Sequence, residues 1–204
     1  MIIDNFDLIR KYLVFDRDND PDTFYYVQII QRRKDEGVTI KKNCKMIRSY
    51  YVTSLRYWDD HEEQIKELCR TFKARAYVHL NPRSWKKCVL MAFGELATYL
   101  RSNQCSSLRK LTEEMAGKYV ADGANKTWIV DIDSKDDEVV NEISGRVNEC
   151  MPVGNKVVDI IPTKNGYHLI TKPFNLMEFR KYYKEGEVDI QKNNPTLLYY
   201  ENQG

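Results

Sequence analysis

Hydrophobic and polar positions along this chain switch between a period of two, typical of strands, and a period near 3.6, typical of helices. In the first 120 residues the pattern predicts a short helix at 5–15, an acidic turn at 16–22, two strands joined by a polar loop, a helix, a third strand and two more helices. We expect the first two strands to pair in antiparallel fashion. The strands are expected at residues 23–33, 46–53 and 75–80, and the longer helices at residues 54–73, 85–101 and 106–119.

The last third of the chain has a more regular order, β-α-β-β-α-β, which is the order of a ferredoxin-like or RNA-recognition-like unit. Its elements are expected at residues 127–132, 136–150, 156–162, 166–171 and 176–184, with final strand residues near Val188 and at 196–200. We therefore predict an α+β protein. Residues 121–204 would form the RNA-recognition-like module, and residues 1–120 an N-terminal α/β elaboration of the same compact domain. The polar stretch 121–126 is the expected boundary.

Two acids end the apolar run Trp128–Asp133. Because side chains alternate between the faces of a strand, Asp131 and Asp133 are expected to project on the same side, where they can share a divalent cation.

A third acid, Asp189, follows Val188 near the end of the chain. Two-metal phosphoryl transfer needs several carboxylates to hold cations about 4 Å apart, and Asp189 is the candidate that completes the set. Taken alone, it is more typical of an ordinary carboxylate at a strand edge or in a turn. Asp136 and Asp137 are better explained as acids in the first turn of a helix, with Ser134 as its cap.

The segment Thr163–His168 is a polar, glycine-bearing turn that leads into an apolar strand. The Gly166 turn exposes backbone N–H groups, Lys164 adds positive charge, and His168 can donate a hydrogen bond to a phosphate oxygen. The alternative is a plain hairpin turn with a half-buried histidine, since Asn-Gly is a common hairpin signal. Two other histidines have simpler explanations, a solvated helix face for His61 and a core strand for His79.

Composition and charge describe an ordinary globular chain of 204 residues, 42% hydrophobic and 30% charged. Its formal charge of +2 provides no strong overall field, so binding of nucleic acid would need a local basic patch. The candidates are residues 31–34, 41–42 and 81–87, the last including Trp85, which can stack on a base. The alternative is that Trp85 begins a helix and packs in the core, while the basic clusters form a solvated face.

Five cysteines without a C-x-x-C pair, at residues 44, 69, 88, 105 and 150, indicate reduced thiols in a cytoplasmic protein. The N-terminus lacks the features of a signal peptide, and no apolar run is long enough to cross a bilayer. We therefore expect no membrane partner.

Three motifs, in this order and on these elements, resemble those of the archaeo-eukaryotic primase (primase-polymerase) superfamily: Asp131-Ile132-Asp133, Gly166-Tyr167-His168-Leu169 and Val188-Asp189. In its ligase-associated polymerase branch the second motif resembles T-S-G-x-x-G-x-H and the third V-D-x-x-x-N. The positions that match these skeletons are Thr163, Gly166, His168, Asp189 and Asn193. The chain departs from the pattern at Gly166, where the family often has serine, and His168 and Asp189 lie only 21 positions apart. The match covers about 70 residues, and residues 1–120 contribute nothing specific to it.

The resemblance implies a small member with an RNA-recognition-like catalytic core and a nucleotidyltransferase activity. Asp131, Asp133 and Asp189 would hold two Mg²⁺ or Mn²⁺ ions, while His168 contacts the nucleotide phosphates, assisted by Lys164 and the Gly166 turn. The implied partners are nucleoside triphosphates, a DNA or RNA template or primer, and proteins of a replication or mobile-element system.

Two alternatives remain open. One is a non-catalytic nucleic-acid-binding or replication accessory protein that retains the fold. The other is a glycosyltransferase, because D-x-D after an apolar strand also binds Mn²⁺ and a sugar nucleotide, although 204 residues is short for that class and the β-β-α-β order that follows does not suit it.

Overall fold

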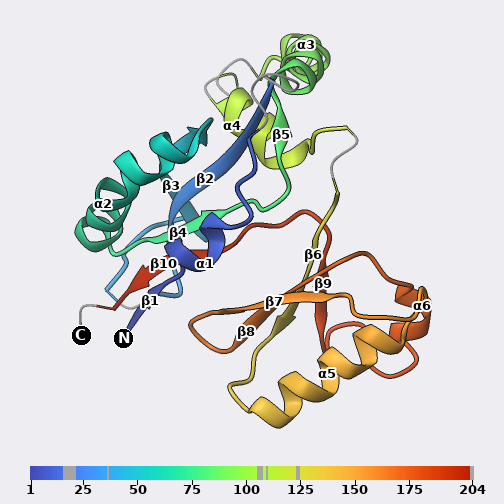
Figure 1. Ribbon diagram of the computed structural model, residues 1–204. Coiled ribbons are helices and arrows are strands. Elements are labelled where there is room, and N and C mark those ends of the chain that lie inside the picture. Colours follow the sequence, from blue (N-terminus) through green and yellow to red (C-terminus); the bar gives the residue numbers. More distant parts are fainter. Residues whose placement is uncertain (16–21, 36, 105–107, 109, 123–124, 203–204) are drawn as a thin grey trace.

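The computed structural model contains two antiparallel sheets, each flanked by helices (Figure 1). It describes residues 1–15, 22–35, 37–104, 108, 110–122 and 125–202. Four expectations fall wholly or partly outside the described residues: most of the acidic turn at 16–22, Cys105, the first part of the helix at 106–119, and part of the boundary stretch at 121–126.

The larger sheet has the strand order β1-β10-β4-β2-β3, and β5 pairs with β2. Its longest strand, β2, is rich in aromatic and β-branched residues, the types that fit a pleated surface. The strands are β1 (Ile2–Asp4), β2 (Thr23–Arg32), β3 (Cys44–Val52), β4 (Arg75–Val78), β5 (Arg83–Ser84) and β10 (Thr196–Glu201). The predicted antiparallel pairing of the first two long strands, β2 and β3, is confirmed.

Helices cover the two faces of the larger sheet unequally. On one face α2 (Leu55–Phe72) buries Trp58 and Ile65 against the alternate residues Val27 and Ile29 of β2. On the opposite face α3 (Trp85–Arg101) and α4 (Leu111–Lys118) cover only the end of β2 that carries Phe24 and Tyr26. The rest of that second face is therefore open to a neighbouring element or a ligand.

The smaller sheet has the order β7-β8-β6-β9 and is antiparallel throughout. Its strands are β6 (Trp128–Ile132), β7 (Val157–Pro162), β8 (Tyr167–Thr171) and β9 (Asp189–Gln191). The helices α5 (Asp137–Glu149) and α6 (Leu176–Phe179) pack on the face that presents Val130 and Leu169. Ile129 and Ile170, on the other face, join the core of the larger sheet. Since Ile129 and Asp131 are two residues apart, the face that carries Asp131 is turned toward the larger sheet.

The predicted α+β class is confirmed, and most predicted elements lie where they were expected. Two predicted helices are shorter: the first is α1 (Phe6–Arg10) and the last is α6. Both end in turns closed by hydrogen bonds between residues three apart, such as Leu13 N to Arg10 O and Tyr182 N to Phe179 O. The very short strands β1 and β5 were not predicted.

The strand predicted at 196–200 belongs to the larger sheet, which corrects its expected place in the β-α-β-β-α-β unit. As β10, it pairs with β1 and β4, and Leu198 is fully buried in the core of the larger sheet. The chain thus leaves the smaller sheet after β9 and ends beside its own N-terminus (Figure 1). The division of the chain at residues 121–126 stays a prediction.

Several smaller expectations can now be compared with the structure. Asp136, and not Ser134, is the N-cap residue of α5, because its carboxylate accepts a hydrogen bond from Glu138 N at 2.9 Å. All described cysteines are free, and Cys44 alone among them is exposed. Across the described ranges, no helix has both the length and the apolar character of a membrane span.

Candidate active site

The strand register of the smaller sheet brings three of the predicted site residues together. Asp131 on β6 lies directly opposite His168 on β8 and directly opposite Asp189 on β9. Residues that are opposite each other in an antiparallel pair point to the same face. The three side chains therefore form a row across the face that is turned toward the larger sheet.

His168 is held at both of its ring nitrogens. Nε2 lies 3.3 Å from Asp131 Oδ1, and Nδ1 lies 2.8 Å from the hydroxyl oxygen of Thr196 on β10. The residue is only 7% exposed, and Thr196 is fully buried. This arrangement suits a ring that receives a hydrogen bond from Thr196 and donates one to Asp131. In the structure, His168 therefore orients the Asp131 carboxylate.

Asp131 and Asp189 share one hydrogen-bond donor. Gln191 Nε2 lies 3.3 Å from Asp131 Oδ2 and 3.0 Å from Asp189 Oδ2. A single amide group, the partially positive end of a side chain, thus lies between the two carboxylates. The pair is close enough to share a small positively charged group.

The donor set agrees with a hard divalent cation that brings part of its own coordination shell. Mg²⁺ usually keeps several waters and binds through one or two carboxylates together with substrate phosphates. Asp131 and Asp133 supply such carboxylates. A ready-made group of three or more His, Cys, Asp or Glu ligands is absent from the part of the chain that the structure describes. Convergence of Asp131, Asp133 and Asp189 on metal ions therefore stays a prediction.

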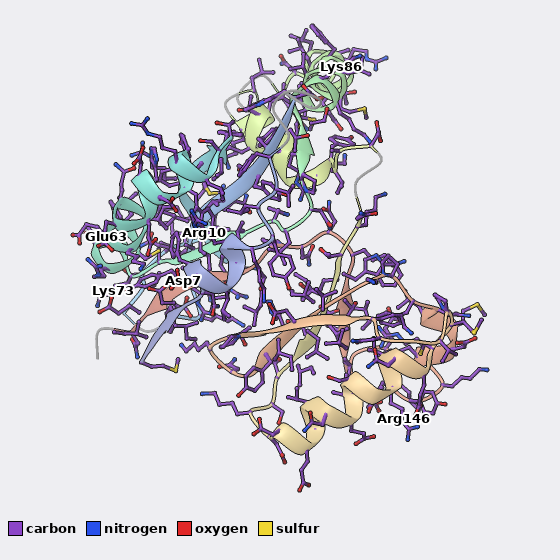
Figure 2. All side chains as sticks on the ribbon, in the orientation of Figure 1. Asp7, Arg10, Glu63, Lys73, Lys86 and Arg146 are labelled. Atoms are coloured by element: carbon purple, nitrogen blue, oxygen red, sulfur yellow. The ribbon has the colours of Figure 1, made fainter. Side chains whose placement is uncertain are left out.

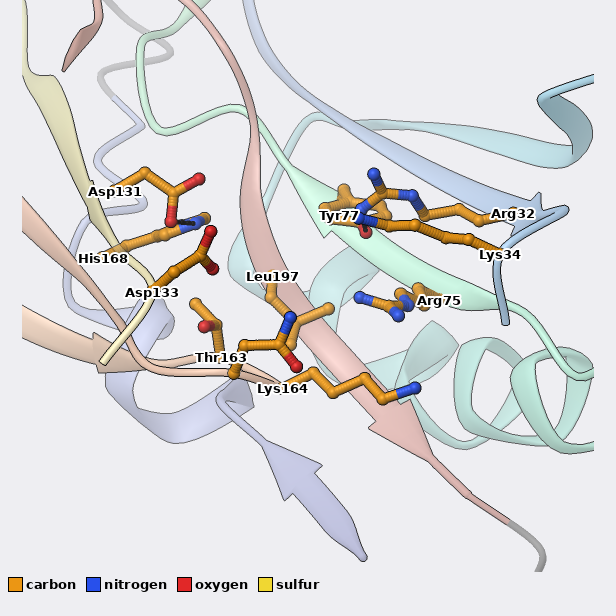
Figure 3. A pocket seen from close by; sticks show the side chains of 11 residues that line it. Arg32, Lys34, Arg75, Tyr77, Asp131, Asp133, Thr163, Lys164, His168 and Leu197 are labelled. Atoms are coloured by element: carbon orange, nitrogen blue, oxygen red, sulfur yellow. Dashed lines mark hydrogen bonds and ion pairs between the residues drawn. The ribbon is translucent and has the colours of Figure 1, made fainter. Parts of the chain in front are cut away.

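A cavity of about 130 Å³ lies between the two sheets. Figure 3 shows the carboxyl groups of Asp131 and Asp133 directed into the same space beside His168, with basic side chains of the larger sheet across from them. We call these two sides the acidic wall and the basic wall. The cavity is lined by Arg32, Lys34, Arg75, Tyr77, Asp131, Asp133, Thr163, Lys164, Asn165, His168 and Leu197. Asp189 is not among them, because it lies on the far side of Asp131.

The basic wall combines one fixed cation with three less constrained ones. Arg75 is only 6% exposed and donates from Nε to Asp35 at 2.8 Å and from Nη2 to the other oxygen of that carboxylate. Arg32 donates to the Tyr77 hydroxyl at 3.0 Å. The side chain of Lys164 extends away from the acidic wall, and its amino group lies 3.8 Å from Asp35. Lys34 is exposed at the edge of the cavity.

Gly166 has a packing role that the sequence pattern did not indicate. A Cβ at this position would overlap the carbonyl oxygen of Ile132 and lie 2.7 Å from Ser134 N, so only glycine lets the β7–β8 turn rest against the end of β6. Its N–H donates to Thr163 Oγ1 at 3.2 Å. The N–H that was expected to face a phosphate is therefore used inside the turn. A direct contact of Gly166 with the nucleotide stays a prediction.

The cluster at residues 81–87 is divided, because Arg83 is buried whereas Lys86 is exposed and Lys87 is half-exposed. Arg83 is fully buried and donates from Nη1 to Asn193 Oδ1 at 2.7 Å, while Nη2 contacts His79 Nδ1. Burial lowers the pKa of Arg83 to about 10, and burial together with the Arg83 charge lowers the pKa of His79 to about 3. The core role predicted for His79 is confirmed. Asn193, matched by the third motif, anchors the segment between β9 and β10.

Trp85 begins α3, as one of its two interpretations predicted, but it is 36% exposed and not buried in the core. Its ring stacks on Phe24 with 4.1 Å between the ring centroids. One face of the indole is therefore already occupied by a side chain, which weakens the case for base stacking there.

Five residues that shape the site were not singled out from the sequence: Asn5, Arg75, Tyr77, Gln191 and Thr196. Asn5 is buried and donates to Pro162 O at 3.0 Å and to Leu197 O at 2.9 Å, which ties the start of the β7–β8 turn to β10. Of the five, Arg75 alone gave a signal, as a charged residue within an apolar strand pattern.

No family model, no curated protein and no solved structure matches this chain. What the fold and the site define is a general class: an α+β protein whose smaller sheet presents an acidic wall to a basic wall of the larger sheet.

Proposed function

We propose that this protein is a divalent-metal-dependent nucleotidyltransferase of the primase-polymerase type. It would add nucleotides from NTPs or dNTPs to a nucleic-acid 3′-hydroxyl, or make primers. The observation that carries the proposal is the cavity in which Asp131 and Asp133 face Arg32, Lys34 and Lys164. A metal-bound triphosphate has complementary parts, because its cations need carboxylate oxygens and its phosphate tail needs positive charge.

The topology of the smaller sheet supports the RNA-recognition-like part of the proposal. Numbered within the unit, the order β7-β8-β6-β9 is second, third, first and fourth strand, the order of a ferredoxin-like sheet. Both helices pack on one face, and the central strand β6 carries Asp131 on the other. Fold alone does not define an activity, so the proposal depends on the cavity and its charges.

In this proposal the acidic wall binds the metal ions. Asp131 and Asp133 would hold Mg²⁺ or Mn²⁺, with Asp189 beside Asp131. When bound, these ions would stabilise the charge that develops on the attacking oxygen, the α-phosphate and the leaving pyrophosphate. His168 hydrogen-bonds to Asp131 and borders the cavity. Because both of its ring nitrogens already have partners, it would contact the phosphates by exchanging Asp131 for a phosphate oxygen at Nε2.

The larger sheet contributes the other half of the site. Lys34 and Arg32 would neutralise the β- and γ-phosphates, and Lys164 reaches the same wall from the β7–β8 turn. Arg75 is already paired with Asp35, so its main effect is to fix the base of the wall.

An incorporation assay tests the proposal. Purified protein with Mn²⁺ should incorporate labelled nucleoside triphosphates into an oligonucleotide or a dinucleotide primer, and removal of the metal with EDTA should stop the reaction. Asp131→Asn and Asp133→Asn should each lower the rate at least about a hundredfold, because each removes a charged ligand while preserving shape.

The matched control is Asp7→Asn, at an exposed surface position of α1 (Figure 2). It should retain the wild-type rate. If wild-type protein and the Asp131→Asn/Asp133→Asn variant gave the same background, the enzymatic proposal would be wrong.

One observation favours a second candidate, a non-catalytic nucleic-acid-binding or replication accessory protein. Asp131 is already satisfied by His168 and Gln191, as expected for a carboxylate with a purely structural role. Oligonucleotide binding without any incorporation would favour this candidate.

A further inference from the structure

Positive charge is concentrated at one end of the β2–β3 hairpin. Residues 31–45 include six Lys or Arg and two acids, a net charge of +4 in a chain whose total is +2. One of the two acids, Asp35, is 6% exposed and is turned inward against Arg75. Its charge therefore does little to offset the cations on the hairpin surface.

Folding brings two basic clusters of the sequence together there. Arg33 begins the loop between β2 and β3, Lys41 and Lys42 lie near its end, and a hydrogen bond of 2.9 Å from Arg33 N to Asn43 O holds the two ends of the loop together. All three are exposed, and the ion pairs of this hairpin involve Asp35 alone among the described residues. We call Arg33, Lys41 and Lys42 the hairpin cations.

A second cavity adjoins the candidate active site at this hairpin. It has a volume of about 340 Å³ and is lined by Arg32, Arg33, Lys34 and Asn43. Arg32 and Lys34 also line the cavity that contains Asp131. The two cavities therefore share a boundary, and positive charge is continuous from the hairpin surface to the basic wall.

An uncovered strip of the larger sheet runs from the same place. Gln28 is opposite Tyr77 and Ser49, and Ile30 is opposite Arg75 and Met46, so these side chains share the face that carries the basic wall. Gln28, Ile30 and Met46 are half-buried. Beyond them the face is closed by α4, whose Glu113 accepts a hydrogen bond from the Ser49 hydroxyl at 3.2 Å.

We propose that this surface binds a single strand of nucleic acid, with backbone phosphates against the hairpin cations and bases over the strip at Ile30 and Met46. The partner fits because a polyanion is bound by a track of several cations, and the faces of unpaired bases can pack against apolar side chains. That the bound strand is the primer or template of the adjacent site rests on the function proposed above. Binding of the strand by itself does not.

Fluorescence anisotropy with a labelled mixed-sequence 12-mer in EDTA tests the surface without metal, nucleotide or catalysis. Arg33→Ala/Lys41→Ala/Lys42→Ala should raise Kd about tenfold or more. The slope of log Kd against log salt should fall by about 2, since each single-strand phosphate contact contributes about 0.7.

The matched control removes three other exposed cations, as Arg101→Ala/Lys181→Ala/Lys184→Ala. It should change Kd less than twofold. Equal loss of affinity in both triple variants would overturn the proposal, as would no binding by the wild type in 50 mM salt. A polyglutamate competitor as effective as the unlabelled 12-mer would point to an acidic polypeptide and would also overturn it.

Failure of this proposal can be distinguished from failure of the proposed function. The Asp131→Asn/Asp133→Asn variant should bind the 12-mer at least as tightly as wild type while incorporating nothing. If the protein bound the strand through the hairpin cations but never incorporated nucleotides, the proposed binding surface would be correct and the proposed enzymatic activity would be wrong. If the hairpin variant kept full incorporation and unchanged strand binding, the enzymatic activity would be supported and the proposed binding surface would be wrong.

Cys44 offers an independent readout of location. It is exposed and lies opposite Arg32 in the β2–β3 register. In a Cys105→Ser background, the 12-mer should slow alkylation of Cys44 by iodoacetamide at least about threefold, and the hairpin variant should lose this protection. Equal alkylation rates with and without the 12-mer would place the strand elsewhere.

Discussion

The two walls of the cavity are built in different ways. The acidic wall lies on and just beyond the central strand of the smaller sheet, where register places Asp131 between His168 and Asp189 and hydrogen bonds orient its carboxylate. Most of the basic wall consists of long side chains from a hairpin end and a turn, and its one cation that is locked in a buried bidentate ion pair, Arg75, lies on β4.

This difference matches what the two ligands need. Metal coordination requires ligand oxygens at short, fixed distances, so its ligands gain from a rigid strand. A triphosphate tail has many equivalent oxygens, and flexible lysines can follow it. We therefore expect substitutions that displace the carboxylates of the acidic wall to lower activity more than substitutions that remove one cation from the basic wall.

Apart from the carboxylates themselves, the largest effect is expected at the junction of the walls. Gly166→Ala would force the β7–β8 turn, which carries Lys164, away from the end of β6, which leads to Asp133. Incorporation should fall at least about tenfold, and the free energy of unfolding by about 2 to 3 kcal/mol, as for overpacking elsewhere. Urea unfolding measures the change in the free energy of unfolding, and the incorporation assay measures the change in rate.

Gly145→Ala is the matched control, because a Cβ there meets nothing within 4 Å and the residue lies inside α5. It should stabilise the protein by about 0.5 to 1 kcal/mol and leave incorporation unchanged. Wild-type stability and activity in Gly166→Ala would contradict the close approach of the turn to β6.

A smaller effect is expected from the basic wall. Lys34→Ala and Lys164→Ala should each raise KM for the nucleoside triphosphate about tenfold with little change in kcat, because each removes one charge-assisted contact with the phosphate tail. Steady-state kinetics over a nucleotide titration measures both constants. Lys181→Ala, at an exposed lysine just after α6, should leave both constants unchanged. If KM stayed the same in Lys34→Ala and Lys164→Ala, these residues would not contact the phosphate tail.

More of the acidic wall than of the basic wall could be predicted from the sequence. Strand alternation puts Asp131 and Asp133 on one side, and the apolar strand after the Gly166 turn locates His168. The alignment of Asp131 with His168 and Asp189 depends on strand register, which the alternation alone does not specify.

Apart from Lys164, the basic wall could not be located from the sequence, because Arg32, Lys34 and Arg75 lie far from the motifs along the chain. β2 and β4 reach the site because the chain passes from β9 of the smaller sheet to β10 of the larger one, where β10 pairs with β4 and buries residues such as Leu198. The pattern around β10 predicted a strand correctly but could not say which sheet it joins. For the same reason, the sequence pattern around Arg32 and Lys34 could not be distinguished from that of an ordinary solvated basic cluster.

The most direct test of the central claim is the anomalous scattering of Mn²⁺ in crystals grown with Mn²⁺ and a non-hydrolysable nucleoside triphosphate. The account predicts a manganese peak bound to the carboxylates of Asp131 and Asp133, at metal–oxygen distances of about 2.1 Å, with the phosphate tail against Lys34 and Lys164. Manganese bound away from these carboxylates, or a triphosphate bound outside the cavity between the sheets, would contradict it.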